Sequence, residues 1–409
     1  MRILFVSPRL CLPLFSGARL REYHLARALG ERAEVTYASF AIPGFPVPAR
    51  ADLPFFNEVH IVPLTGRYTP LKIARGLVGR WPLGVVNYTR AAMKSALAGI
   101  VARRRFDLVH LEGAHLAAYV PFLQSATAAP VVFDWHNIES ELIRRYSARV
   151  TWLPKKAYAA ITARRMAATE SWLLRVGLGH TVCSAREREH LLALAPTARV
   201  ALVENGVDLD YFGAAGVASE RRRIVFVGSM DYHANVEAAA WFVRRVWPRV
   251  SAAFPHLKLT LVGSNPVPAV RELAETPNVE VTGTVEDVRP FYREAVAAIV
   301  PLLTGGGTRL KILEAMAAGV PVVSSSIGAE GLEVSPDNDI LIADGAEAWL
   351  TALRSLSADA ALAGARAASG RELVRLRYDW RILGERLYRT YERWLADDRR
   401  SDCARPAIV

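Results

Sequence analysis

Short apolar segments alternate with stretches of helical periodicity along the whole chain, and this alternation constrains the fold most. In the first half the apolar segments are "ILFVS", "EVTYAS", "EVHIVPL", "LVHLE", "PVVFDWH" and "HTVCS". In the second half they are "IVFVG", "LKLTLVG", "VEVTG", "AAIVPLL", "PVVSSS" and "DILIAD". Strands separated by helices form parallel sheets with crossover connections. The sequence therefore predicts an α/β protein with two doubly wound domains of about six strands each.

Length and turn residues indicate where these domains meet. A chain of 409 residues is long for one hydrophobic core. The segment "ENGVDLDYFGAAGVASERRR" is rich in turn residues and charge, as expected of a linker. We expect an N-terminal domain over 1–190, a second domain over 191–375, and a final helix and tail over 376–409 that cross back to the first domain. Because open parallel sheets bind ligands beyond the carboxyl ends of their strands, we expect the site in the cleft between the domains.

Cysteine usage and hydropathy indicate the compartment. Cys11, Cys183 and Cys403 are widely spaced and form no CxxC pair, so we expect a reducing cytoplasm and no metal site. No apolar run approaches the roughly 18 residues of a membrane span. The opening "MRILFVS" is interpreted as a buried strand and not as a signal peptide, because no small-residue cleavage site follows it.

Positive charge is concentrated in the first half of the chain. Residues 1–185 carry a net charge of +13, whereas the whole chain carries +11. Residues 60–106 mix Lys and Arg with Leu, Ile, Val and Trp, and contain no acidic residue. One interpretation is two ordinary helices with solvated basic faces; the other is peripheral docking on the anionic inner face of a membrane. We expect no nucleic-acid partner, because the sequence contains no recognised nucleic-acid module.

Candidate site residues lie at or after the ends of three predicted strands of the first domain. Gly17 lies in the turn after the first strand, where it lets the backbone approach a ligand at the start of a helix. His110 and Glu112 end the fourth strand, and Asp134 and His136 follow the fifth in "DWHNIES". A lone histidine at a strand end is more often structural than catalytic. A histidine among Asp, Asn and Glu beyond an apolar strand favours a functional site.

The segment "TGGGTRLKILEAMAAGVPVV", residues 304–323, combines features of a phosphate site. Gly305, Gly306 and Gly307 allow backbone N–H groups to approach phosphate, and Thr308 suits a helix N-cap. Two cations, Arg309 and Lys311, then fall in the first helical turn, where positive charge opposes the helix dipole unless an anion is bound.

Glu314 follows one turn later in the same predicted helix. It suits a carboxylate that accepts hydrogen bonds from a ribose diol. The alternative is a surface pair between Lys311 and Glu314 at i,i+3 spacing. The combination of a phosphate loop and a ribose-binding carboxylate favours a nucleotide ligand.

Several motifs in order resemble retaining glycosyltransferases of the GT-B fold, specifically glycosyltransferase family 4. "LEAMAAGVPVV" resembles the second half of the family's E-x7-E signature, "ENGVD" its interdomain segment, and "PLFSGARLREYHLARAL" its N-terminal glycine loop. The resemblance implies two Rossmann-like domains and transfer of a sugar, with retention, from a UDP- or GDP-sugar to a glycan or lipid-linked acceptor. It implies no metal and no cofactor beyond the donor, which is a substrate. We expect a role in cell-surface polysaccharide or glycolipid assembly.

The resemblance also assigns donor contacts in the second domain, where the chain departs from the pattern. Gly228, Ser229, Asn235 and Val285 take positions of the donor site. Ser229 and Asn235 stand where the family has its phosphate-binding Arg and Lys, and Gly306 stands where it has the first glutamate. We therefore expect Arg309 and Lys311 to bind the diphosphate instead.

The first domain departs from the family pattern at one more position. Glu112 replaces the second histidine of the family's H-x-H pattern, which leaves His110 and His136 to position the sugar. In a retaining front-face reaction the leaving phosphate itself can take the acceptor's proton. Two alternatives remain open: a nucleotide-sugar epimerase of the same fold, and a nucleotide-sugar-binding protein that has lost catalysis.

Overall fold

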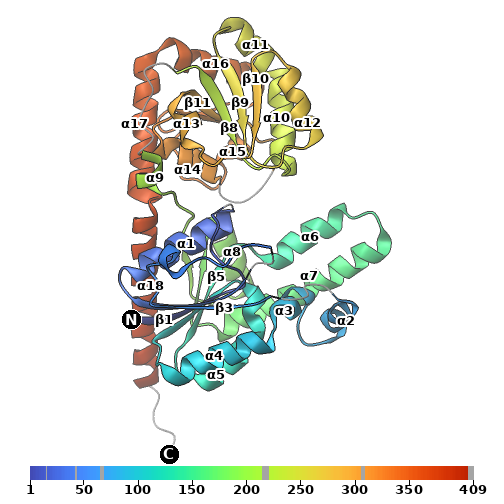
Figure 1. The fold of residues 1–409 in the computed structure, drawn as a ribbon, viewed down its shortest axis with the longest axis vertical. Helices are drawn as coiled ribbons and strands as arrows, with labels where there is room; N and C mark the ends of the chain where they lie inside the picture. Colours follow the sequence, from blue (N-terminus) through green and yellow to red (C-terminus); the bar gives the residue numbers. More distant parts are fainter. Residues whose placement is uncertain (15, 42–43, 65–68, 214–220, 305–308, 404–409) are drawn as a thin grey trace, which may run out of the picture. The chain divides into compact units, whose positions relative to one another are not determined.

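The chain divides into two compact units, each with its own parallel sheet (Figure 1). The computed structural model describes residues 1–14, 16–41, 44–64, 69–213, 221–304 and 309–403. Unit 1 comprises Met1–Glu204 together with Leu383–Val409, and unit 2 comprises Asn205–Ile382. The prediction of two doubly wound α/β domains is confirmed by these two sheets.

The sheet of unit 1 has seven strands in the order β3-β2-β1-β4-β5-β6-β7. All neighbouring strands are parallel. The strands are β1 (Arg2–Ser7), β2 (Glu34–Phe40), β3 (Glu58–Val62), β4 (Leu108–Glu112), β5 (Val131–Trp135), β6 (Gly179–Val182) and β7 (Val200–Leu202). The helices are α1 (Gly17–Gly30), α2 (Pro70–Val78), α3 (Leu83–Tyr88), α4 (Ala91–Arg103), α5 (Val120–Ala126), α6 (Glu139–Arg149), α7 (Leu153–Val176), α8 (Ala185–Leu194) and most of α18 (Trp380–Cys403).

Burial explains which of these strands the sequence reveals. Every residue of β4 and β5 is buried, because helices cover both faces of a central parallel strand. The edge strand β7 has three residues, all only half-buried, and the six strands expected from the sequence omit it.

The sheet of unit 2 has six parallel strands in the order β10-β9-β8-β11-β12-β13. The strands are β8 (Arg223–Val227), β9 (Lys258–Val262), β10 (Val279–Gly283), β11 (Ala295–Val300), β12 (Val322–Ser324) and β13 (Leu341–Ile342). The helices are α9 (Leu209–Gly213), α10 (His233–Arg245), α11 (Trp247–Ala253), α12 (Pro268–Arg271), α13 (Arg289–Arg293), α14 (Leu310–Ala317), α15 (Ser326–Ala329), α16 (Ala346–Ala358) and α17 (Ala360–Arg377). All six strands expected from the sequence are present in this sheet.

The last helix, α18, packs closely within unit 1 from Leu383 onward. Glycines allow this approach at two points. A Cβ on Gly384 would lie 2.1 Å from the Cβ of Ala28 in α1, and a Cβ on Gly179 in β6 would lie 2.5 Å from the ring of Trp394. None of the helices within the described residues combines the length and the apolar character needed to cross a bilayer.

Candidate functional site

Three predicted residues of unit 1 meet at the carboxyl ends of β4 and β5. The Oε1 atom of Glu112 lies 2.8 Å from Nε2 of His110, and its Oε2 atom lies 2.5 Å from Nε2 of His136. Burial alone would raise the pKa of Glu112, but the two histidines outweigh burial and hold that pKa below its usual range. The carboxylate in turn raises the pKa of His136 against the effect of burial. Glu112 and His136 therefore form a buried ion pair.

His110 is fully enclosed, so its part in this cluster is to hold Glu112. Its ring stacks on Phe5 at 4.0 Å between centroids, and Nδ1 lies 2.6 Å from the hydroxyl of Tyr391 in α18. Because the ionised Glu112 only accepts hydrogen bonds, Nε2–H of His110 donates to it and the Tyr391 hydroxyl donates to Nδ1. Of the two histidines, His136 is the more exposed, with 9% of its side chain accessible.

Asp134, expected beside His136 at the site, is instead bound to an arginine that the sequence did not single out. Arg21 of α1 contacts both carboxylate oxygens of Asp134 at 2.7 Å, and neither side chain is accessible to solvent beyond 1%. The guanidinium also donates to the carbonyl oxygens of Val203 (2.6 Å) and Glu204 (3.1 Å). Arg21 therefore joins α1, the end of β5 and the last residues before unit 2.

Glu22 is a second buried residue of α1 that sequence patterns did not reveal. Its Oε1 accepts a hydrogen bond of 2.6 Å from Tyr37, and burial, assisted by repulsion from Glu112, raises its pKa to about 8. Within the described residues, Glu22, Glu112 and His136 are the three side chains whose ligand atoms come within 4.8 Å of one another, as a metal site would need. Protonation of Glu22 would relieve its repulsion from Glu112.

In unit 2, four predicted residues meet at the carboxyl end of β8. Nζ of Lys311, in the first turn of α14, donates to Oδ1 of Asn235 at 2.9 Å and lies 4.5 Å from the ring centre of Phe226. Nδ2 of Asn235 donates to the carbonyl oxygen of Ser229 at 2.8 Å. A Cβ on Gly228 would lie 2.7 Å from both side-chain nitrogens. The absence of a side chain at Gly228 therefore makes room for the ammonium group.

The two flanking charges of the same segment are also largely enclosed. Arg309, the residue before α14, is only 6% exposed. Burial raises the pKa of Glu314 to about 7, although Lys311 and a hydrogen bond with Tyr292 oppose the shift. Burial likewise lowers the pKa of Lys311 to about 7, although Glu314 opposes it. Both groups are poised to change charge when an anion or a diol binds.

Of the remaining predicted residues, two are described and four lie outside the described residues. Gly17 is the first residue of α1, and Val285 is half-buried in the loop after β10. Gly305, Gly306, Gly307 and Thr308 lie outside the described residues.

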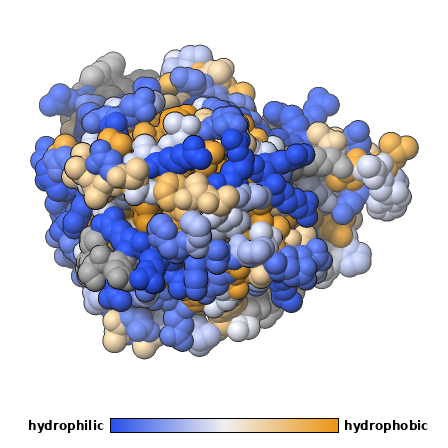
Figure 2. Space-filling model, turned by 90° about the horizontal axis from the view of Figure 1, so that it is seen from above, coloured by the Kyte–Doolittle hydropathy of each residue, from blue (hydrophilic) through white to orange (hydrophobic). Residues whose placement is uncertain are grey.

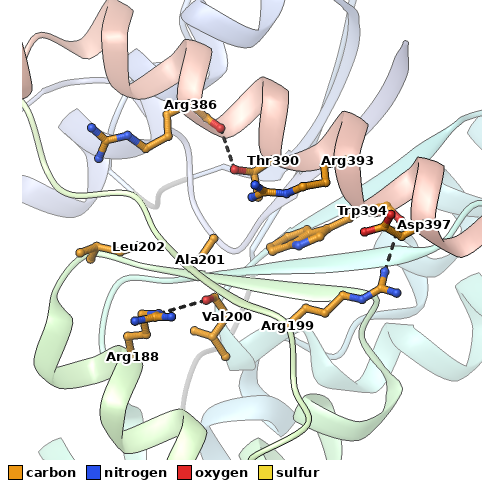
Figure 3. A pocket seen from close by; sticks show the side chains of 10 residues that line it. All are labelled: Arg188, Arg199, Val200, Ala201, Leu202, Arg386, Thr390, Arg393, Trp394 and Asp397. Carbon is orange, nitrogen blue, oxygen red and sulfur yellow. Dashed lines mark hydrogen bonds between the residues drawn. The ribbon is translucent and has the colours of Figure 1, made fainter.

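A separate groove of about 490 Å³ lies between β7 and α18 and is rich in arginine (Figure 3). Arg188 donates to the carbonyl oxygen of Val200 at 3.3 Å, and Arg199 donates to that of Trp394 at 3.3 Å. Arg386 lies 2.5 Å from the carboxylate of Glu204. Because these arginines bind groups of the protein itself, we interpret the groove as the seam that holds α18 against the edge of the sheet.

Each of the two units contains a segment that matches a known protein family. Residues 16–206 match the family described as "Glycosyl transferase 4-like domain", and residues 221–359 match "Glycosyl transferases group 1". A phosphatidyl-myo-inositol mannosyltransferase of Mycolicibacterium smegmatis is 29% identical over 201 residues, which is 46% of this chain and 51% of that protein. An uncharacterised 44.6 kDa protein in the cps region of Klebsiella pneumoniae is 30% identical over 129 residues, 30% of this chain and 33% of that protein. The matches thus span between a third and about half of the length of these two relatives.

Solved structures resemble the whole chain at low sequence identity. Sucrose-phosphate synthase from Thermosynechococcus elongatus superposes with a TM-score of 0.67 at 18% identity, over 97% of this chain and 100% of the other. HepE from Anabaena, in complex with UDP and glucose, superposes with a TM-score of 0.63 at 13% identity, over 96% and 99%. The fold of this chain is therefore the two-domain GT-B fold.

Proposed function

The chain belongs to the group 1 glycosyltransferases, and from this premise we propose that it transfers a sugar from a nucleotide-sugar donor to a glycan or lipid-linked acceptor. We propose a UDP- or GDP-sugar as donor and retention of the anomeric configuration, in the assembly of a cell-surface polysaccharide or glycolipid. The similar proteins support this assignment: one acts on phosphatidyl-myo-inositol by name, one is encoded in a cps region, and one is a complex with UDP and glucose.

The position of Lys311 carries the proposal for donor binding. The resemblance to the family leads us to expect cations at the positions of Ser229 and Asn235, which are uncharged here. The ammonium of Lys311 lies 2.9 Å from the Asn235 amide oxygen. Lys311 of α14 thus places a positive charge at the carboxyl end of β8. Asn235, which lies beside it, is neutral and cannot supply this charge. A diphosphate at this point would gain a charge-assisted contact with Lys311 and a second positive charge from Arg309.

Charge on the leaving group determines the proposed chemistry. When the bond between the sugar and the diphosphate breaks, negative charge grows on the phosphate, and fixed cations beside it stabilise that transition state. A phosphate oxygen then takes the proton of the acceptor hydroxyl as the new glycosidic bond forms on the same face. Glu314 would bind the ribose. In unit 1 we assign His136 to the transferred sugar and its ion-pair partner Glu112, held by His110, to positioning.

Residues 60–106 support a proposal of peripheral membrane binding. Helix α2 is amphipathic and basic, and it leaves Leu71 and Val78 exposed at 69% and 86%. Apolar residues beside Lys72 and Arg75 suit the boundary between lipid headgroups and acyl chains. This location would bring unit 1 to a lipid-linked acceptor.

Titration calorimetry with UDP and GDP tests the donor site. We expect Arg309→Ala and Lys311→Met each to weaken binding at least tenfold, which is about 1.4 kcal/mol, because a diphosphate loses a partner of opposite charge. Lys258→Met is the matched control, since Lys258 starts the exposed amino end of β9. Thermal unfolding of the variants shows whether they are folded. Unchanged affinity in folded Lys311→Met protein overturns the donor site.

Nucleotide release from a panel of nucleotide sugars tests the reaction. Nucleotide release that requires an acceptor supports sugar transfer. An α-linked product from an α-linked donor supports retention of the anomeric configuration. Conversion of the nucleotide sugar without release of nucleotide supports epimerisation instead. Binding without turnover supports a protein that has lost catalysis.

A further inference from the structure

Helices α6 and α7 of unit 1 form an arm that runs beyond the sheet (Figure 1). The two helices pack along each other and are joined by residues 150–152. The connection is held in place, because the hydroxyl of Ser147 donates to the carbonyl oxygen of Lys156 at 3.2 Å and Lys155 lies 5.7 Å from the ring centre of Tyr146. The end of α6 and the start of α7 therefore contact each other at the outer end of the arm, residues 146–156.

Large apolar side chains at this outer end are exposed to solvent. Leu153 is 75% exposed, Trp152 is 66% exposed and Tyr146 is 49% exposed. Figure 2 shows hydrophobic atoms at the far end of the arm, at the right edge of the view. Residues 151–157 are all exposed, so these side chains add nothing to the core of unit 1. Apolar groups clustered in this way on a folded surface mark a binding site for another apolar surface.

The positive charge of the arm indicates which kind of surface it binds. Between Glu141 and Glu170 the sequence has seven Lys and Arg and no acidic residue. Lys155 and Lys156, both exposed, follow the apolar pair Trp152 and Leu153 after Pro154. Tryptophan and tyrosine accumulate at the boundary between water and lipid, and neighbouring cations are attracted to anionic headgroups.

We propose that the outer end of the α6–α7 arm inserts Trp152 and Leu153 into the headgroup region of an anionic bilayer. This inference deepens the proposed function, because it names the segment that anchors the enzyme where a lipid-linked acceptor lies. It is separate from the basic region 60–106, which is a second candidate contact. Trp152 precedes α7, Leu153 starts it, and Lys155 and Lys156 lie in its first turn. The apolar pair and the cations therefore share the outer end of the arm, as a shallow anchor requires.

Sedimentation of the full chain with lipid vesicles tests this inference. Vesicles of phosphatidylcholine containing about 30% phosphatidylglycerol are compared with pure phosphatidylcholine, at low and high salt. We expect Trp152→Ser/Leu153→Ser and Lys155→Gln/Lys156→Gln each to lower the partition coefficient on anionic vesicles at least fivefold. The matched control is Leu194→Ser/Leu376→Ser, which removes two leucines exposed at 45% and 54% elsewhere. A second comparison, Leu71→Ser/Val78→Ser, measures the contribution of α2.

Fluorescence quenching locates the contact directly. Brominated lipid should quench the wild-type protein more than Trp152→Phe, which keeps an aromatic anchor and should still bind. The inference is overturned if the arm variants bind as wild type does, if only Leu71→Ser/Val78→Ser reduces binding, or if brominated lipid quenches both proteins equally. Binding that is equal on neutral and anionic vesicles also overturns it. These assays contain no donor, so their failure leaves nucleotide binding, measured by calorimetry, as a separate result.

Discussion

At the scale of single residues, the titration of Lys311 links donor binding to pH. Its pKa is lowered to about 7 by burial, whereas a diphosphate would favour the charged ammonium and raise that pKa again. Binding above pH 7 therefore takes up a proton. We predict that the affinity for UDP or GDP falls as pH rises from 7 to 9, by at most about tenfold per pH unit. Calorimetry in buffers of different ionisation enthalpy measures both the affinity and the proton uptake.

Lys311→Arg is the control for this prediction. Arginine stays charged across the range, so this variant should bind with an affinity that changes little with pH. A wild-type affinity that is flat from pH 7 to 9 contradicts the assignment. The stability of the free protein should change with pH in the opposite direction to the affinity. Between pH 7 and the ordinary pKa of 10.5, the unfolded chain binds more protons at Lys311 than the folded chain does. The contribution of Lys311 to stability therefore rises with pH in this range.

The sequence indicated candidate residues whose side-chain chemistry suits a binding site. It did not indicate the charged residues that are buried beside that site. Gly228 was a candidate because it follows an apolar strand, and Glu112 because it ends one. Lys311 was a candidate because it follows three glycines at the start of a predicted helix. The contact between Lys311 and Asn235, 76 positions apart, depends on how two helices sit on one sheet. Arg21 and Glu22 could not be predicted, because a charged residue in "LREYHLARAL" has the pattern of a surface position until its distant partners are known.

At the scale of elements, strand prediction succeeded where a strand is buried on both faces. The central strands are continuous apolar segments, whereas β7 is short and half-buried at an edge and gives no such signal. Helix α18 was expected from its periodicity, but its close contacts with α1 and β6 are determined by glycines. Gly384 and Gly179 occupy points where the backbone of one element meets a side chain of another.

The contact between α1 and α18 gives a prediction for Gly384→Ala. The new methyl group would lie 2.1 Å from the Cβ of Ala28, so the helices must separate. We expect a loss of about 1–3 kcal/mol in the free energy of unfolding, as for other overpacked contacts. Thermal or urea unfolding of the full chain measures the change.

Gly364→Ala is the matched control for that substitution. It places the same methyl group in helix α17, where no atom lies within 4 Å. Alanine is the better helix former, so we expect a gain of about 0.5–1 kcal/mol. If both substitutions stabilise the protein, the helices are not held at the distance that the structure gives.

At the scale of the whole molecule, the two units have separate cores and opposite charge. The buried cluster of unit 1 lies within residues 4–191 and that of unit 2 within 207–378. Unit 1 carries 33 Lys and Arg against 19 Asp and Glu, a net charge of +14, and unit 2 carries 18 against 21, a net charge of −3. The basic character of the chain is therefore a property of unit 1 alone.

Separate cores predict unfolding in two steps. In calorimetry we expect two transitions, because cooperativity is carried by a shared core and each unit has its own. Gly384→Ala should lower the transition of unit 1, and Gly364→Ala should raise that of unit 2. A single transition that both substitutions shift would show that the units unfold together.

Unit 1 is built from two separate segments of the sequence, with unit 2 between them. During synthesis, unit 1 can therefore be completed only after unit 2 has been made. The hydroxyl of Tyr391 that holds His110, and the indole of Trp394 against β6, leave the ribosome only after all of unit 2. A nascent chain can thus finish unit 2 while unit 1 still lacks its last helix. The contact between Tyr391 and His110 is therefore made last, and a chain interrupted before α18 lacks the hydroxyl that holds His110.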